Sequence, residues 1–290
     1  MASFVHSLDP NNVRARNCLT RCWGDLANAL ILCHSELRTD PSHREGWTTI
    51  WRTVLTDPVE HAKAYPFPAP NHSYVFEAGQ WSALENDGFD VNGRTPVLAA
   101  GSNQSPEQLA RKYADLPEIG PIPVVRGYLS DFDVVYAAHL AGYGSIPATF
   151  QNSPGTTVSV FIAWFTDAQL SRMHATEGNY SFDRLKDFRL ETDLGKSPQD
   201  VFVYTAKVGC YNHNGSCLSL TEIPAINRKF PSATQSKAQS FLRNRLAVGM
   251  DLDQFVEEHI TDNVVRAGRV AAMRADAIEI GYPRDTLQSL

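Results

Sequence analysis

The chain lacks several features that would assign it to common classes of protein. No apolar run is long enough to span a bilayer, and Met1 to His6 lack a basic region followed by an apolar stretch. There is no block of basic residues, and the formal net charge is −6. We therefore expect no membrane partner, no nucleic-acid partner and a cytoplasmic location.

Cysteine is also scarce, with five residues in a chain of 290. An odd number in a chain of this length does not fit the disulfide framework of a small secreted protein. The only local groupings are Cys18 with Cys22, four apart on an expected helix, and Cys210, His213 and Cys217 in an expected hairpin. A metal site needs more ligands at better spacing, so we predict no metal and no other cofactor.

The residues that are present predict three regions, without internal repeats or low-complexity tracts. Residues 1–95 form a helical and irregular N-terminal extension, with amphipathic helices expected at 11–38 and 47–55. Its part from 57 to 95 is rich in proline and aromatic residues, which suits either a covering wall of the core or a lid. Residues 222–290 form a helical C-terminal extension that packs on the core.

The middle region, residues 96–221, is rich in predicted strands. They are expected at 96–100, 122–129, 132–139, 157–166, 180–193 and 201–208, with helices at 105–115 and 167–176. Val158 to Phe165 are nearly all apolar, which predicts a central strand buried on both faces. Many strands with few helices between them indicate an α+β fold whose mixed sheet curls toward a barrel, and a small barrel can enclose a polar cavity.

The most informative stretch runs from Pro96 into a predicted helix start at residues 105–108. Val97 to Ala100 are typical of a short buried strand, and Gly101 allows a sharp turn. The Ser-Pro-Glu-Gln sequence that follows has a capping Ser, a Pro at the first helical position and an acidic first turn. A strand, tight turn and helix in this order leave backbone N–H groups suited to a carboxylate or a polarised carbonyl.

A second motif, Met-His-Ala-Thr-Glu-Gly-Asn-Tyr, occupies residues 173–180. It ends a helical pattern and precedes a strand-like run. A carboxylate next to a glycine at such a turn can enter a cavity at little steric cost, which makes Glu177 a candidate catalytic residue. Taken alone, a Glu in this position is more simply a solvated turn residue, and the upstream Gly-Ser-Asn favours the functional interpretation.

At these residues the chain resembles the gamma-glutamyl cyclotransferase-like family. Gly101-Ser102-Asn103 and Glu177-Gly178 match the family's turn and acid motifs, and three segments between them match in kind: Gly127–Phe132, Ile146–Phe150 and Val158–Trp164. The resemblance covers about residues 95 to 210. One departure concerns the pocket, because the family's Tyr before Gly-Ser-Asn is replaced by Ala100.

The resemblance implies a gamma-glutamyl cyclotransferase-like mixed β-barrel core with helical N- and C-terminal extensions. It also implies a small-molecule substrate, a gamma-glutamyl amide or peptide. The α-amine of this substrate attacks its own γ-carbonyl, closes a five-membered ring and releases 5-oxoproline and an amine. Such an enzyme is an amide-cleaving acyltransferase or lyase.

Under this resemblance Glu177 is the general base toward the α-amine and then the acid toward the leaving nitrogen. No metal or covalent intermediate is needed, because the nucleophile is intramolecular and its effective molarity is high. The strand end, the turn and one aromatic residue bind the substrate: Leu98, Ala99, Ala100, Gly101, Ser102, Asn103 and Tyr180.

Two alternatives keep the fold but change the function. One is hydrolysis or decarboxylation of an amide or urea derivative, as in a related domain attached to allophanate hydrolases. The other is a binding protein that holds a small ligand without turnover. Ser102 as a hydrolase nucleophile is disfavoured, because the Gly-x-Ser-x-Gly elbow is absent. The flanking helices could also form a homodimer surface.

Overall fold

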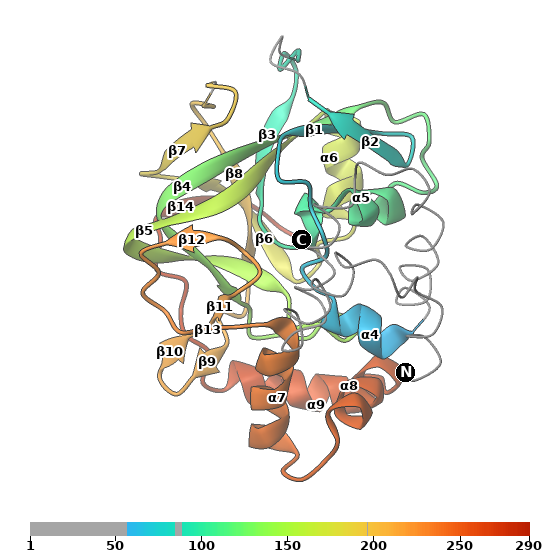
Figure 1. Ribbon diagram of the computed structural model, residues 1–290, viewed down its shortest axis with the longest axis vertical. Helices are drawn as coiled ribbons and strands as arrows, with labels where there is room; N and C mark the ends of the chain where they lie inside the picture. Colours follow the sequence, from blue (N-terminus) through green and yellow to red (C-terminus); the bar gives the residue numbers. More distant parts are fainter. Residues whose placement is uncertain (1–56, 85–88, 196) are drawn as a thin grey trace, which may run out of the picture. The chain divides into compact units, whose positions relative to one another are not determined.

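The computed structural model describes residues 57–84, 89–195 and 197–290 (Figure 1). The chain divides into two compact units, Met1–Asp57 and Pro58–Leu290, and the architecture below is that of the second. The helices predicted at 11–38 and 47–55, with Cys18, Cys22 and Cys33, lie outside the described residues. The region boundaries at 95/96 and 221/222 stay predictions.

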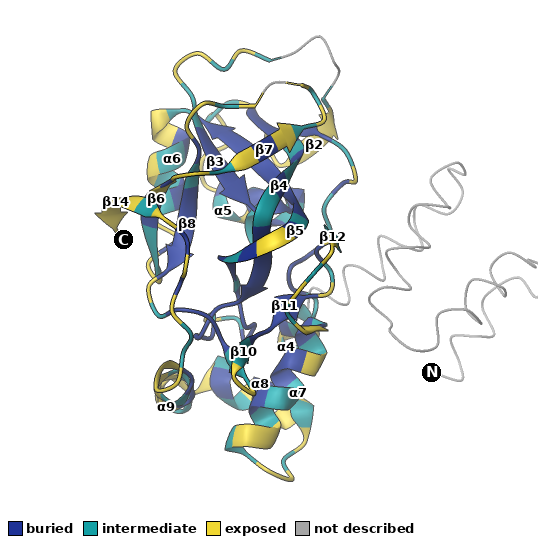
Figure 2. Ribbon diagram, turned by 90° about the vertical axis from the view of Figure 1, so that its left-hand side faces the viewer, coloured by how far each residue is buried: buried dark blue, intermediate teal, exposed yellow. Residues whose placement is uncertain are grey.

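Four strands make the centre of a 12-stranded mixed sheet. The longest, β5 (Ala148–Phe165), pairs antiparallel with β4 (Ile122–Tyr136) on one side and with β3 (Thr95–Ala99) on the other. β3 in turn pairs in parallel with β8 (Phe202–Ala206). Every residue from 158 to 165 is buried, which confirms the predicted central strand. Figure 2 shows the central strands largely in the colour of buried residues, with an exposed stretch on β5.

The other strands are shorter. They are β1 (Tyr74–Glu77), β2 (Gln80–Ala83), β6 (Tyr180–Leu185), β7 (Arg189–Thr192), β9 (Asn212–His213), β10 (Ser216–Cys217), β11 (Ser219–Leu220), β12 (Ala225–Ile226), β13 (Ser232–Ala233) and β14 (Arg284–Ser289). All except the β9–β10 hairpin belong to the large sheet, whose main path is β13-β11-β4-β5-β3-β8-β6-β14.

This sheet confirms the α+β class but corrects the predicted barrel. β13 and β14 stand at opposite ends of the path and do not pair with each other within the described part of the chain. One end consists of two-residue strands, and β14 at the other end is mostly exposed. These ends present too few matching backbone groups to close the sheet, because closure requires tilted, staggered strands with continuous partners.

The structure also joins two predicted strands into one. We predicted separate strands at 122–129 and 132–139, whereas β4 is continuous and its pairing with β5 shifts register between Ser130 and Phe132. Asp131 between them has a φ of 65°, and its carboxylate accepts the backbone N–H of Gly155 at 2.8 Å. The polar residues between the two predicted strands therefore form a β-bulge within one strand and not a turn between two.

The described helices are α4 (Pro58–Lys63), α5 (Pro106–Lys112), α6 (Asp167–His174), α7 (Gln235–Leu246), α8 (Leu252–Thr261) and α9 (Asn263–Arg274), with a 3-10 turn η3 (Ser102–Gln104). Figure 1 places α4 and the three C-terminal helices at one end of the sheet, and α5 and α6 nearer the other. We expected residues 222–290 to be helical. The structure shows that this region also contributes the strands β12, β13 and β14.

Local capping explains where these helices begin. Thr166 and Gln169 form a reciprocal capping box at the start of α6, and the Asp251 side chain accepts two backbone N–H groups at the start of α8. Among the described helices, none combines the length and the apolar character needed to cross a bilayer.

The C-terminal helices hold one loop of the future site in place. His259 of α8 and Gln239 of α7 both bond to the carbonyl oxygen of Gly144, at 2.9 and 3.1 Å. The next residue, Ser145, donates its hydroxyl to Ala62 of α4 at 2.7 Å. Burial lowers the pKa of His259 to about 4, so its ring is neutral at pH 7 and presents an N–H to the carbonyl. The loop that carries Tyr143 is thus fixed from three helices.

A buried ion pair ties the segment after β11 to the central sheet. Asp133 of β4 is 0% exposed. Its carboxylate accepts hydrogen bonds from two nitrogens of the Arg228 guanidinium, Nε at 2.9 Å and Nη2 at 3.1 Å. The Ser219 hydroxyl of β11 adds a hydrogen bond of 2.7 Å. Removing the guanidinium would leave a buried carboxylate without its counter-ion.

We therefore expect Arg228→Ala to lower the free energy of unfolding by about 3–5 kcal/mol, measured by urea denaturation. The matched control is Arg189→Ala, which removes an exposed ion pair with Asp131, two residues earlier in the same strand. Its unfolding midpoint should stay close to that of the unmodified protein, because exposed pairs contribute little. Equal midpoints for both variants would contradict this account.

Candidate functional site

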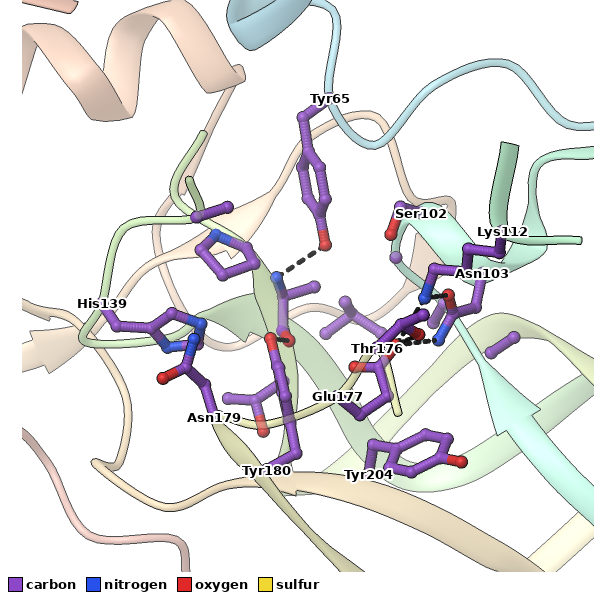
Figure 3. A pocket seen from close by; sticks show the side chains of 18 of the residues that line it. Tyr65, Ser102, Asn103, Lys112, His139, Thr176, Glu177, Asn179, Tyr180 and Tyr204 are labelled. Carbon is purple, nitrogen blue, oxygen red and sulfur yellow. Dashed lines mark hydrogen bonds and ion pairs between the residues drawn. The ribbon is translucent and has the colours of Figure 1, made fainter. Parts of the chain in front are cut away.

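A cavity of about 450 Å³ lies where β3, η3, α5, the loop over 139–143, the start of β5 and the α6–β6 turn meet (Figure 3). Its size is in the range of small-molecule sites. Tyr65, from the segment after α4, is one of the lining residues, which fits both the covering wall and the lid considered for residues 57–95. The cavity is therefore built from parts far apart in the sequence.

The residues predicted for the site all line this one cavity. They are Leu98, Ala99, Ala100, Gly101, Ser102, Asn103, Glu177 and Tyr180. The strand–turn–helix motif supplies one wall and the α6–β6 turn supplies another. Their juxtaposition is a finding of the structure, whereas their roles in binding and catalysis stay predictions.

Glu177 is buried, with 8% of its surface exposed, although its neighbours Thr176 and Gly178 are exposed. Its Oε1 accepts hydrogen bonds from Lys112 at 2.5 Å, from Asn103 at 3.1 Å and from Thr176 at 3.4 Å. Its Oε2 accepts none from any described residue. The carboxylate is thus anchored through one oxygen, and the other has no partner among the described residues.

Lys112, in the last turn of α5, organises this anchor. Its ammonium contacts Glu177, the Asn103 side-chain oxygen at 2.6 Å and the Met173 sulfur at 3.4 Å. Three contacts match the three N–H bonds of an ammonium, so Lys112 compensates charge and orients Glu177. Nothing in the sequence marks Lys112 as part of a site, because a lysine near the C-terminus of any helix interacts favourably with the helix dipole.

The two glycines of the motifs differ in what they do. A Cβ at Gly101 would lie 2.4 Å from the hydroxyl oxygen of Tyr65, so this position must be glycine for the tyrosine to approach. A Cβ at Gly178 would meet nothing within 4 Å, and its φ is not in the left-handed region. Steric freedom at Gly178 is therefore not what places Glu177 in the cavity, contrary to our expectation.

Two tyrosines meet the backbone of Ala148 at the start of β5. The N–H of Ala148 donates to Tyr65 Oη at 2.7 Å, and Tyr180 Oη donates to the carbonyl oxygen of Ala148 at 2.9 Å. Figure 3 shows the Tyr65 and Tyr180 side chains approaching each other from opposite sides of the cavity, with Glu177 nearby. Tyr65 was not a predicted site residue, because nothing in the sequence links it to the turn at Gly101.

The histidines near the motifs take different positions. His139 lines the cavity, is 3% exposed, and its Nδ1 has no hydrogen-bond partner among the described residues. Burial lowers its pKa to about 3, so the ring is neutral. His174 does not line the cavity but bonds through Nδ1 to the hydroxyl of Tyr204, which does, at 2.9 Å.

The charges around the cavity favour an anionic ligand. Arg111, Lys112 and Arg172 line it, whereas Glu177 is the one carboxylate among its described lining residues. Arg172 pairs with Asp115 at 2.7 Å outside the cavity, and the Arg111 guanidinium lies 5.2 Å from the centre of the Tyr143 ring. This local excess of positive charge contrasts with the net charge of −6.

No group of three or more metal-ligating side chains was found in the part of the chain that the structure describes. Cys210 and Cys217, considered above as partial ligands, are buried free thiols that both contact the side-chain amide of Gln151.

No protein-family model and no curated protein matches the sequence. Among solved structures, an uncharacterized protein from Homo sapiens is similar at 14% identity and a TM-score of 0.33, covering 57% of this chain and 88% of its own. A gamma-glutamyl cyclotransferase is similar at 15% identity and a TM-score of 0.32, covering 57% and 86%. The second carries the name of the family that the motifs resemble.

Because His139 is neutral in the folded protein, we predict that acid lowers the stability of the fold. Its pKa is about 3 in the folded protein and about 6.5 when unfolded. Between these values the unfolded chain binds a proton that the folded chain does not, so the free energy of unfolding falls as the pH falls. The contribution approaches about 1.4 kcal/mol per pH unit.

We expect His139→Gln to remove this contribution. Urea denaturation at several pH values from 7 to 5 should give a shallower loss of stability for the variant than for the unmodified protein. Identical slopes would mean that His139 can be protonated within the folded cavity.

Proposed function

We propose that the chain is an enzyme of the gamma-glutamyl cyclotransferase type, which cleaves a gamma-glutamyl amide or peptide and releases 5-oxoproline and an amine. One observation carries the proposal. The buried carboxylate of Glu177, anchored through Oε1 and without a partner at Oε2 among the described residues, lines the same cavity as the turn at Gly101–Asn103. Intramolecular cyclisation needs little more than a proton acceptor and a site for an anionic substrate.

The substrate's α-carboxylate has suitable partners in this cavity. The backbone N–H groups of Gly101 and Asn103 donate no hydrogen bond to a described residue, and Arg111 and Arg172 add positive charge. A carboxylate held on this side would leave the substrate's α-ammonium free to approach Glu177. Backbone N–H groups of this kind bind anions without a change in protonation.

The chemistry then follows from proton transfer by one carboxylate. Glu177 Oε2 accepts a proton from the α-ammonium, and the resulting amine attacks the γ-carbonyl carbon. The bond between this carbon and the leaving nitrogen breaks as the ring is completed. Two protons pass in total from the α-nitrogen to the leaving nitrogen, which departs as an ammonium, and no water is consumed.

Lys112 and Asn103 would keep the carboxylate in place during both transfers. Because all three contacts of the Lys112 ammonium are already made, it acts on the reaction through Glu177 and not on the substrate. A cytoplasmic location and a homodimer stay predictions.

The direct test is incubation with a panel of gamma-glutamyl amides and peptides, with 5-oxoproline as the measured product. We expect turnover of at least one compound, and a loss of at least about 100-fold in kcat for Glu177→Gln, because an amide cannot accept the proton. Glu191→Gln, which changes an exposed carboxylate on β7 away from the cavity, is the matched control and should retain full activity.

Two results would count against the proposal. One is the absence of 5-oxoproline from every compound on the panel. The other is turnover by Glu177→Gln at the rate of the Glu191→Gln control.

A further inference from the structure

The backbone N–H and C=O of Ala148, which belong to successive peptide groups, give Tyr65 and Tyr180 opposite hydrogen-bonding roles. The Tyr65 oxygen accepts the Ala148 N–H, whereas the Tyr180 hydroxyl donates to the Ala148 carbonyl oxygen. Both tyrosines line the cavity that contains Glu177. A hydroxyl group has one hydrogen and two lone pairs, so each contact determines what the tyrosine can still offer.

Tyr65 retains its hydrogen. Its oxygen accepts the Ala148 N–H at 2.7 Å, and the backbone of Ser102 makes a smaller favourable interaction with the same oxygen. The hydroxyl hydrogen has no acceptor among the described residues. Accepted hydrogen bonds polarise an O–H group and make it a stronger donor.

Tyr180 has the opposite capacity for hydrogen bonding. Its hydrogen is used in the bond to Ala148, and its oxygen accepts no hydrogen bond from a described residue. It can therefore accept one. Burial raises the pKa of both phenols well above the usual value of 10, so both remain protonated at neutral pH.

A hydroxyl donor at Tyr65 and a hydroxyl acceptor at Tyr180, both lining the cavity, match the two polar ends of an amide. We propose that Tyr65 donates its hydroxyl hydrogen to the carbonyl oxygen of the bound amide, and that Tyr180 accepts the amide N–H. This inference rests on the proposed function, in which that amide is the bond to be cleaved. Tyr65 then stabilises the negative charge that develops on the oxygen as the α-amine attacks.

The packing around Tyr65 is consistent with a positioned donor. Its side chain is 3% exposed, and its hydroxyl fits against Gly101, where a Cβ would lie only 2.4 Å away. The oxygen is therefore held between the turn at Gly101 and the start of β5. A donor that is fixed before the reaction costs no reorganisation when the charge appears.

The test compares Tyr65→Phe with Tyr136→Phe. Tyr136 is a fully buried tyrosine whose hydroxyl donates to the backbone of Ala233 at 3.0 Å, and it does not line the cavity. With a turned-over gamma-glutamyl amide, we expect Tyr65→Phe to lower kcat about 100-fold and to leave KM within about threefold, as for the loss of one oxyanion donor. Tyr136→Phe should leave both constants unchanged.

A binding measurement separates this proposal from the cyclisation itself. 5-Oxoproline contains both a carbonyl and an N–H in its ring, whereas cyclopentanecarboxylate has the same ring size and carboxylate without the amide. By calorimetry, Tyr65→Phe should weaken binding of 5-oxoproline about tenfold, as for one lost hydrogen bond, and leave cyclopentanecarboxylate unaffected.

The outcomes are distinguishable. If 5-oxoproline is released but Tyr65→Phe turns over within threefold of the unmodified protein, the role of Tyr65 is wrong and the proposed function stands. If no amide is cyclised but Tyr65→Phe selectively weakens 5-oxoproline binding, the proposed function is wrong and amide recognition by Tyr65 stands. Equal weakening of both ligands would overturn the role of Tyr65, because the ring would then only shape the cavity.

Discussion

The ion pair between Glu177 and Lys112 is the interaction on which the rest of the site depends. A carboxylate with 8% of its surface exposed requires compensation, and the ammonium at 2.5 Å supplies it. Because Asn103 bonds to both partners, the pair also joins the turn after β3 to the turn after α6. One buried charge thus connects two segments separated by 74 residues, while Oε2 has no hydrogen-bond partner in the described part of the chain.

The cavity wall opposite this pair depends on parts of the chain outside the strand–turn–helix unit. Tyr65 comes from the segment after α4, and the loop with Tyr143 is held at Gly144 by His259 and Gln239 of the C-terminal helices. These helices therefore contribute to the site by positioning, although none of their residues lines the cavity. The flanking regions complete a hollow that the central sheet alone would leave open on this side.

Sequence reasoning was most accurate where a short stretch contains its own structural signal. The apolar run at Val158 predicted a central buried strand, and the Ser-Pro sequence predicted the start of α5, because both are local signals. Ser105 occupies the N-cap position, but its side chain makes no capping hydrogen bond, contrary to our expectation. Sequence reasoning was wrong where the fold depends on pairing between strands far apart in the sequence. The predicted barrel does not close, and the two predicted strands on either side of Asp131 form one strand. It missed Lys112 and Tyr65, since an ordinary lysine or tyrosine carries no sign of its partner.

By itself, the sequence determined the α+β composition, the turn at Gly101 and the choice of Glu177 as the acid to consider, because each follows from neighbouring residues. Only the tertiary structure decided that the turn and the acid line the same cavity, that Lys112 anchors the carboxylate and that Tyr65 lies against Gly101. The physical reason is that burial and charge compensation arise from contacts between segments far apart in the chain, and these contacts exist only when the sheet and its covering helices have packed together.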